Sequence, residues 1–264
     1  MQRWDTVEAC RIWRDAAQQA GETIGFVPTM GALHAGHSTL IERARAECDR
    51  VVVSIFVNPT QFNDASDFDN YPNTLAEDLS LCESLDVDGV FMPTRDSLYP
   101  DGYRFRLTEN AYSTKLEGEH RPGHFDGVLT VVMKLLQIVS PQKAYFGEKD
   151  WQQLSLIRDM AKAFYMPVAI VPVPTVREPD GLALSSRNRR LSASARARAA
   201  AFPKILVQSA TAEEAARELQ LAGFEVEYVS DSDGRRLAAV VLDGVRLIDN
   251  WDLSQVGIAS TVLV

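Results

Sequence analysis

The sequence is poor in cysteine and contains no long apolar run. Three of the 264 residues are cysteines, Cys10, Cys48 and Cys82, and none of them forms a C-x-x-C pair. An odd number of scattered cysteines does not suit a disulfide framework or a zinc site, and it indicates a reducing compartment. The first five residues contain no apolar signal region, and no apolar run approaches the length of a membrane span. We therefore expect a soluble, cytoplasmic protein without a membrane partner.

An excess of positive charge is also absent. The chain has 27 Lys and Arg against 36 Asp and Glu, a net charge of −9. This charge argues against nonspecific binding of nucleic acid. It does not exclude a phosphate ligand, because the local field decides such binding. An acidic enzyme that binds a polyanion needs a concentrated basic cluster, together with a divalent metal. The remaining composition, 46% hydrophobic and 24% charged, is typical of a soluble globular protein.

The most informative stretch joins an apolar run to a loop rich in glycine. The run Thr23–Val27 is strand-like, the loop contains Gly31 and Gly36, and a helical pattern begins at about His37. A strand, a glycine loop and a helix N-terminus in this order present backbone N–H groups and a positive dipole end to a phosphate. His34 stands three residues before His37, so that a helix opening would turn both toward the same anion. The alternative is a pair of solvated turn histidines.

A second apolar run, Val51–Val57, is rich in β-branched residues and is typical of a parallel strand buried on both faces. The connection between the two runs implies a right-handed crossover and a parallel sheet. Ligands bind beyond the carboxyl ends of such strands. Asn58 and Gln61 stand at this end of the second strand, so we expect two adjacent strands to deliver polar groups to one crevice. Standing alone, this segment would be interpreted as an Asn-Pro turn with a solvated Gln.

A second strand-to-helix junction lies at residues 143–150. A short strand runs into Gly147, and Lys149 and Asp150 precede the next helix. Lysine is a compact charge that suits a phosphate. Aspartate suits a magnesium ion that keeps most of its waters. One of Gln152 and Gln153, in the first turn of the helix, would face the same pocket. A solvated charged turn is the alternative.

Two polar loops complete the candidate site. The segment Pro174–Asn188 contains two prolines and a glycine, which exclude regular structure over much of it. In this segment Ser185, Ser186 and Arg187 offer two hydroxyls and a guanidinium that would close over a triphosphate. A long polar loop at 117–127 carries Arg121, which suits anion capture or a lid, although such loops are often surface decoration.

The remaining patterns predict a large α/β domain, 1–175, and a smaller α+β domain, 176–264. In the first we also expect a helix from Thr6 to Ala20, a loop from Asn63 to Tyr71, a helix opened by a capping box at 74–77, and an edge strand at 104–107. The second is expected to contain helices at 192–201, 203–209 and 211–222, and short strands at 224–229, 237–241 and 245–248, joined by Asp-Gly turns.

Several of these segments together resemble one family. Pro28-Thr-Met-Gly-Ala-Leu-His-Ala-Gly-His37 is similar to the nucleotide-binding signature of the pantothenate synthetase (pantoate–β-alanine ligase) family, which belongs to the wider group of H-x-G-H adenylyl-transferring enzymes. Further matches follow in the expected order: an Arg-Pro-x-His-Phe-x-Gly-Val stretch from Arg121, a Phe-Gly-Glu-Lys-Asp-x-Gln-Gln stretch at 146–153, the 185–187 loop and the closing motif at 246–250. Trp151 departs from the Tyr expected there, and the helical part between 192 and 223 is shorter than usual.

The resemblance implies a Rossmann-like nucleotide- and pantoate-binding domain, a carboxyl-terminal lid, ATP as substrate, Mg²⁺ and a homodimer. The implied reaction condenses pantoate with β-alanine through a pantoyl adenylate and releases AMP and pyrophosphate, a step of coenzyme A biosynthesis. It assigns catalysis to His34, His37, Lys149 and Arg187, substrate contacts to Gln61 and Gln153, and the metal to Asp150. It assigns ATP contacts to Met30, Gly31, Ala32, Leu33, His34, Ala35, Gly36, His37, Gly147, Glu148, Lys149, Asp150, Val176, Leu184, Ser185, Ser186 and Arg187.

Two other functions use the same motifs. A nucleotidyltransferase would adenylylate a phosphorylated cofactor precursor with the same H-x-G-H loop. Gln61 and Gln153 argue against a nucleotidyltransferase, because they suit a small neutral-to-acidic substrate. A non-catalytic adenine-nucleotide sensor could dispense with the phosphate-gripping side chains, which are present here.

Overall fold

The structure, a computed structural model, describes residues 1–63 and 68–256. The chain divides into two compact units. The first comprises Met1–Gly147 and Gln152–Val173, and the second comprises Glu148–Trp151 and Pro174–Val264. The short segment Glu148–Trp151 thus belongs with the carboxyl-terminal part of the chain, although it directly follows a strand of the first unit.

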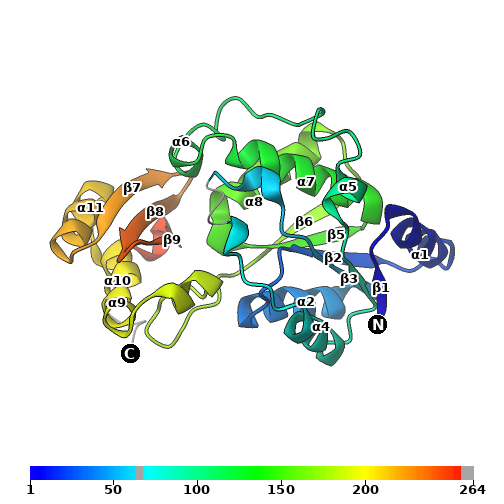
Figure 1. The fold of residues 1–264 in the computed structure, drawn as a ribbon. Coiled ribbons are helices and arrows are strands. Elements are labelled where there is room, and N and C mark those ends of the chain that lie inside the picture. Colours follow the sequence, from blue (N-terminus) through cyan, green and yellow to red (C-terminus); the bar gives the residue numbers. More distant parts are fainter. Residues whose placement is uncertain (64–67, 257–264) are drawn as a thin grey trace. The chain divides into compact units, whose positions relative to one another are not determined.

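The first unit is built on a six-stranded parallel sheet (Figure 1). The spatial order is β1 (Gln2–Trp4), β4 (Gly89–Phe91), β3 (Arg50–Ile55), β2 (Ile24–Thr29), β5 (Lys143–Gly147) and β6 (Ala169–Val173). Strand β2 is the branch point, because Gly25 pairs with Val51 of β3 on one side and with Lys143 of β5 on the other. The chain order reverses there, which makes the carboxyl end of β2 the expected ligand crevice of a doubly wound sheet.

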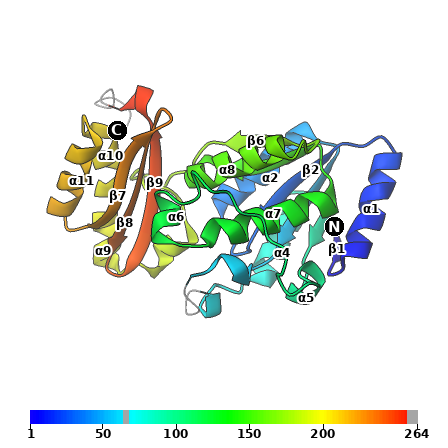
Figure 2. The ribbon, with the colours of Figure 1, turned by 90° about the horizontal axis from the view of Figure 1, so that it is seen from above.

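Helices cover both faces of this sheet. Helices α2 (Ala35–Glu47) and α4 (Leu75–Ser84) lie below it in Figure 1, and α7 (His124–Val139) and α8 (Trp151–Ala163) lie above it. Helix α1 (Val7–Gln19) lies beside β1 (Figure 2). Shorter helical segments are η1 (Pro59–Gln61), α5 (Arg95–Leu98) and α6 (Glu117–His120). Apolar side chains of α2, such as Ile41, pack against fully buried valines of β2 and β3. The prediction of a Rossmann-like α/β fold is confirmed.

The second unit contains a three-stranded antiparallel sheet in the order β7 (Glu225–Ser232), β8 (Arg235–Leu242) and β9 (Val245–Asp252). The connections are Asp-Gly pairs, in which both residues have positive φ, 50° and 75° at 233–234 and 49° and 74° at 243–244. Such turns match the twist of the flanking strands. Helices α9 (Ala193–Ala199), α10 (Ala201–Gln208) and α11 (Ala212–Leu221) lie on one face of this sheet (Figure 2). Phe202, Leu206 and Leu219 form the core between them. The expected small α+β module is confirmed.

Two local predictions are wrong. Residues 104–107 are not a strand: Phe105 N donates to Asp101 Oδ2 at 2.8 Å and Leu107 N to Thr130 Oγ1 at 2.9 Å, so side chains take the N–H groups that a sheet would use. The capping box at Thr74 does not form, because the Thr74 hydroxyl lies 3.2 Å from a carboxylate oxygen of Asp78 instead.

Other element boundaries also moved. The polar loop at 117–127 contains α6 and the start of α7, and α2 begins at Ala35 rather than at His37. The expected loop from Asn63 to Tyr71 includes residues 64–67, which lie outside the described residues.

Candidate functional site

The loop after β2 carries two histidines and occupies the branch point of the sheet. Its backbone takes an unusual path, because Gly31 (φ 81°) and Ala32 (φ 52°) are both left-handed. This conformation is strained for a residue with a side chain. Successive residues with such geometry turn their N–H groups toward one point and form an anion-binding concavity.

A carboxylate of the protein fills this concavity. Ala32 N donates to Asp78 Oδ2 at 2.9 Å, and Leu33 N donates to Asp78 Oδ1 at 2.7 Å. Gly31 N donates to Thr29 Oγ1 at 3.2 Å. Asp78 comes from α4 and is 3% exposed. The expectation that these N–H groups are presented to a phosphate is therefore corrected, because they bind the protein's own side chains. Phosphate binding by the two histidines stays a prediction.

The two histidines cap helix α2. His34 is the N-cap residue, and its Nδ1 accepts a hydrogen bond from Gly36 N at 3.1 Å. His37 Nδ1 accepts from His34 N at 3.3 Å. A ring nitrogen that accepts a hydrogen bond carries no proton, so each neutral imidazole bears its proton on Nε2. The ring centroids are 4.2 Å apart, so the two rings are neighbours. That both face the same anion stays a prediction.

The loop after β3 places Gln61 beside the histidine loop. Gln61 is 9% exposed, and its Nε2 lies 3.2 Å from Met30 Sδ. Asn58 Nδ2 donates to Gln61 Oε1 at 2.9 Å, and Tyr99 OH donates to Asn58 Oδ1 at 2.8 Å. Burial raises the pKa of Tyr99 to about 12, which keeps this donor protonated. The Gln61 side chain thus lies beside Met30, and its amide group has a fixed orientation. That His34 and His37 share one crevice with Gln61 stays a prediction.

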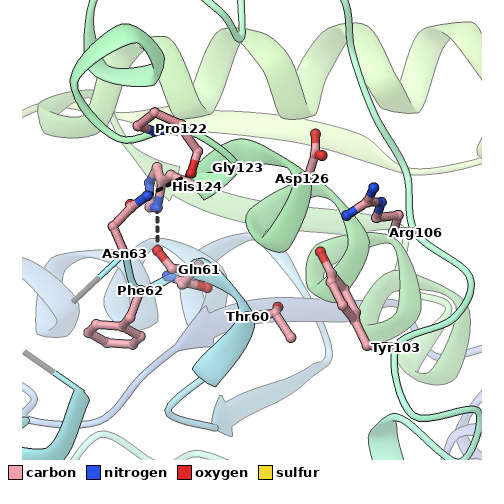
Figure 3. A pocket seen from close by; sticks show the side chains of 10 residues that line it. All are labelled: Thr60, Gln61, Phe62, Asn63, Tyr103, Arg106, Pro122, Gly123, His124 and Asp126. Atoms are coloured by element: carbon pink, nitrogen blue, oxygen red, sulfur yellow. Dashed lines mark hydrogen bonds between the residues drawn. The ribbon is translucent and has the colours of Figure 1, made fainter. Parts of the chain in front are cut away.

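The backbone of Gln61 is held from the side of α7 (Figure 3). Its carbonyl accepts from His124 Nδ1 at 2.8 Å. It also accepts from Arg121 Nη2 at 3.3 Å, and Arg121 Nη1 donates to Glu117 Oε1 at 2.8 Å. These contacts brace the Gln61 turn, and they favour a structural role for Arg121 over anion capture. A cavity of about 160 Å³ adjoins them and is lined by Thr60, Gln61, Phe62, Asn63, Tyr103, Arg106, Pro122, Gly123, His124 and Asp126.

The two glutamines at the start of α8 have different environments. Gln152 is 4% exposed; its Oε1 accepts from Glu117 N at 3.1 Å, and its Nε2 donates to the carbonyls of Tyr112 at 2.8 Å and Lys115 at 2.9 Å. This amide group therefore holds the chain ahead of α6. Gln153 is half-buried and remains the candidate for a substrate contact.

The second unit brings the predicted cationic groups together. Lys149, Ser185 and Arg187 line one small cavity. Ser185 is the N-cap of the short helix η3 (Ser186–Arg190), and its hydroxyl accepts from Arg187 N at 3.3 Å. The predicted ATP contacts Val176 and Leu184 also lie side by side, since Leu184 N donates to Val176 O at 2.9 Å.

Known proteins of one family are similar to this chain over nearly its whole length. The family model for pantoate-beta-alanine ligase matches residues 2–252. The chain belongs to the pantoate–beta-alanine ligase family. A pantothenate synthetase of Bdellovibrio bacteriovorus is 58% identical over 240 residues, which cover 91% of this chain and 94% of that protein. One of Legionella pneumophila is 49% identical over 229 residues, 87% of this chain and 91% of that protein.

Solved structures of the pantoate–beta-alanine ligase family share the fold. The ligase of Francisella tularensis, complexed with beta-gamma ATP and beta-alanine, superimposes with a TM-score of 0.91 at 43% identity and covers 96% of this chain and 98% of its own. The pantothenate synthetase of Thermus thermophilus gives a TM-score of 0.87 at 40% identity and covers 96% of this chain and 99% of its own. The predicted family and enzyme class are thereby confirmed.

Asp150 is the predicted metal ligand of this pantoate–beta-alanine ligase family member. Its side chain is 45% exposed and lies 3.7 Å from Lys149 Nζ. Within residues 1–63 and 68–256, no group of three or more His, Cys, Asp or Glu forms a metal-binding cluster. One accessible carboxylate fits a Mg²⁺ ion that is held mainly by substrate phosphates and water. In the same part of the chain, no helix combines the length and apolar character needed to cross a bilayer.

The sequence analysis missed Asp78 and Asn250. Asp78 stands in the first turn of a predicted helix, where a carboxylate is ordinary. Asn250 Nδ2 donates to the carbonyls of Glu148 and Lys149, at 2.9 Å each. Its only sequence signal was its place in the closing motif at 246–250.

Proposed function

We propose that the protein is an ATP-dependent ligase that forms pantothenate in two steps. A carboxylate oxygen of pantoate attacks the α-phosphorus of ATP, and pyrophosphate leaves, which gives pantoyl adenylate. The amine of β-alanine then attacks the acyl carbon, the carbon–oxygen bond to the phosphate breaks, and AMP leaves. The family match over residues 2–252 carries this proposal, and the complex of the Francisella relative with beta-gamma ATP and beta-alanine supports it.

The first loop would stabilise the charge that develops on the phosphates. Nδ1 of His34 and of His37 accepts a backbone N–H group, so in the neutral rings Nε2 carries the proton, and His37 is the candidate proton donor. Preorganised donors of this kind stabilise the transition state without reorganisation. Residues Met30–His37 are proposed to line the nucleotide.

The cationic groups of the second unit would neutralise the polyanion. Attack of a carboxylate on a triphosphate is disfavoured until negative charge is compensated. Lys149 and Arg187, which share a cavity with Ser185, are proposed to hold the α-phosphate and pyrophosphate, with Ser186 beside them. Asp150 would hold Mg²⁺, which when bound supplies further charge neutralisation on the phosphates.

Two glutamines would orient pantoate. Because Asn58 Nδ2 binds Gln61 Oε1, the amide nitrogen of Gln61 is the end that would donate to the substrate. Gln153 would donate from α8. Neither adds like charge beside the pantoate carboxylate. Gly147, Glu148, Val176 and Leu184 are proposed to hold adenine and ribose through their backbone groups.

A homodimer in the cytoplasm, with domains 1–175 and 176–264, completes the proposal. Light scattering on the purified protein should give about twice the chain mass of 29.3 kDa. A mass equal to one chain would contradict the dimer.

The test of the reaction is exchange of labelled pyrophosphate into ATP. We expect exchange that depends on pantoate, and release of AMP only after β-alanine is added. Exchange with a phosphorylated cofactor precursor and none with pantoate would instead support a nucleotidyltransferase. ATP binding without turnover would support a nucleotide sensor.

A further inference from the structure

We infer that Asn250 is a positioning residue that sets the location of the Lys149 ammonium, and that Arg235 orients the Asn250 amide group for this role. The inference rests on the proposed role of Lys149 in phosphate binding. It concerns groups of the second unit alone.

The side chain of Asn250 grips the backbone of the lysine segment. Its Nδ2 donates to the carbonyls of both Glu148 and Lys149, at 2.9 Å each. Asn250 is 3% exposed, so water does not compete strongly for these bonds. Its own backbone is fixed as well, since its N–H donates to Asp249 Oδ1 at 2.7 Å and its carbonyl accepts from Arg177 Nη2 at 3.3 Å.

Arg235 fixes the orientation of this amide group. Its Nη1 donates to Asn250 Oδ1 at 2.6 Å, which leaves Nδ2 directed at the two carbonyls. Its Nη2 donates to Glu148 Oε2 at 2.8 Å. Its guanidinium carbon lies 3.8 Å from the ring centre of Trp151. The guanidinium group of Arg235 thus stacks on an aromatic face and also binds a carboxylate through its N–H groups.

The ring of Trp151 is the surface on which Arg235 stacks, and an indole is the best aromatic partner for a cation. The segment Glu148–Trp151 is thus fastened to β8 and β9 at its first, second and last residues.

The place that the Lys149 ammonium can reach depends on the path of its backbone. Its ammonium is a point charge on a flexible stem of four carbons, so the path of its backbone decides where it can reach. Lys149 lines the cavity that also contains Ser185 and Arg187. Fastening the backbone at 148 and 149 to the hairpin of β8 and β9 therefore keeps the ammonium with Arg187 in one rigid site. A misplacement of about 1 Å at such a site can reduce the rate on the order of a hundredfold.

The test is a double-mutant cycle with Asn250→Asp and Lys149→Ala. Aspartate has the same shape but cannot donate to the two carbonyls. We expect Asn250→Asp to lower pantoate-dependent pyrophosphate exchange, and to weaken ATP binding measured by calorimetry, by about tenfold or more when Lys149 is present. In the Lys149→Ala background it should have almost no further effect on either quantity. Asp243→Asn, in the turn at the opposite end of the β8–β9 hairpin with its carboxylate bound to Arg198, is the control and should change neither.

Equal factors for Asn250→Asp in both backgrounds would overturn the inference, because a general structural defect does not depend on Lys149. If Asn250→Asp does not fold, Arg235→Lys replaces it in the same cycle. Lysine keeps the charge but cannot bind Asn250 and Glu148 as a fork, so the same non-additive loss is expected. The absence of exchange with pantoate in the unmodified protein would refute the proposed function, and the ATP titrations would still decide the inference.

Discussion

The carboxylate of Asp78 holds the histidine loop in a strained conformation, and Asp78→Asn is the substitution that tests this role. The carboxylate accepts from Ala32 N at 2.9 Å and from Leu33 N at 2.7 Å, and it is 3% exposed. Asparagine offers an oxygen to one N–H group and turns its own NH₂ toward the other. One bond to a charged acceptor is lost, and a buried donor is left unsatisfied.

The expected loss in the free energy of unfolding follows from these two effects. Hydrogen bonds to charged groups contribute roughly 1.5–3 kcal/mol, and an unsatisfied buried donor costs a similar amount. We therefore expect the free energy of unfolding to fall by about 3 kcal/mol. The left-handed backbone at Ala32, which costs on the order of 1–2 kcal/mol, would relax in the variant and displace His34. Because His34 is displaced, the rate of pantoate-dependent pyrophosphate exchange should fall as well.

Urea unfolding and the exchange assay measure the two consequences. Glu77→Gln is the matched control, because it removes the same charge from the neighbouring, exposed position of the same helix. The reasoning would be refuted if Asp78→Asn and Glu77→Gln had equal stabilities and equal exchange rates.

Three further predictions follow from other contacts. His37→Ala should lower the rate of pantoate-dependent exchange at least about a hundredfold with the fold intact, and a near-normal single-turnover rate would remove the residue from the mechanism. Gly127→Ala should strongly destabilise the protein in thermal unfolding, since an added Cβ would lie 2.4 Å from the Thr60 carbonyl oxygen; an unchanged melting temperature would contradict this packing. The hydrogen bond from Arg196 lowers the pKa of Asp180. The stability that this carboxylate provides is therefore fully present above its unfolded-state pKa of about 4. It is lost as the pH falls through the lower folded-state pKa. Asp180→Asn should therefore reduce the loss of stability below about pH 4 in acid unfolding curves, and identical curves would contradict the assignment.

Much of the fold is predictable because local patterns and topology agree. The apolar runs of β2, β3 and β5 are buried on both faces, so their sequences indicate parallel strands directly. The Asp-Gly pairs of the second unit have the positive φ angles that their sequences predict. The loops at the carboxyl ends of β2 and β3 also lie next to each other, as the contact of Gln61 with Met30 shows.

The contacts that shape the site are not predictable from local patterns. Asp78 binds N–H groups more than forty residues away, and nothing near it in the sequence distinguishes it from a carboxylate at a helix start. The false strand at 104–107 has the same origin, since Asp101 and Thr130 take backbone N–H groups that a pattern of apolar residues assigns to a neighbouring strand. The grouping of Glu148–Trp151 with the second unit depends on Arg235 and Asn250, about a hundred residues later.

In the proposed reaction, the pantoate carboxylate is activated by attack on the α-phosphorus of ATP. Turnover with pantoate labelled with ¹⁸O in its carboxylate tests it directly by mass spectrometry of the products. We expect one labelled oxygen in AMP and none in pyrophosphate. Label in inorganic phosphate, or pantothenate formed without labelled AMP, would contradict it.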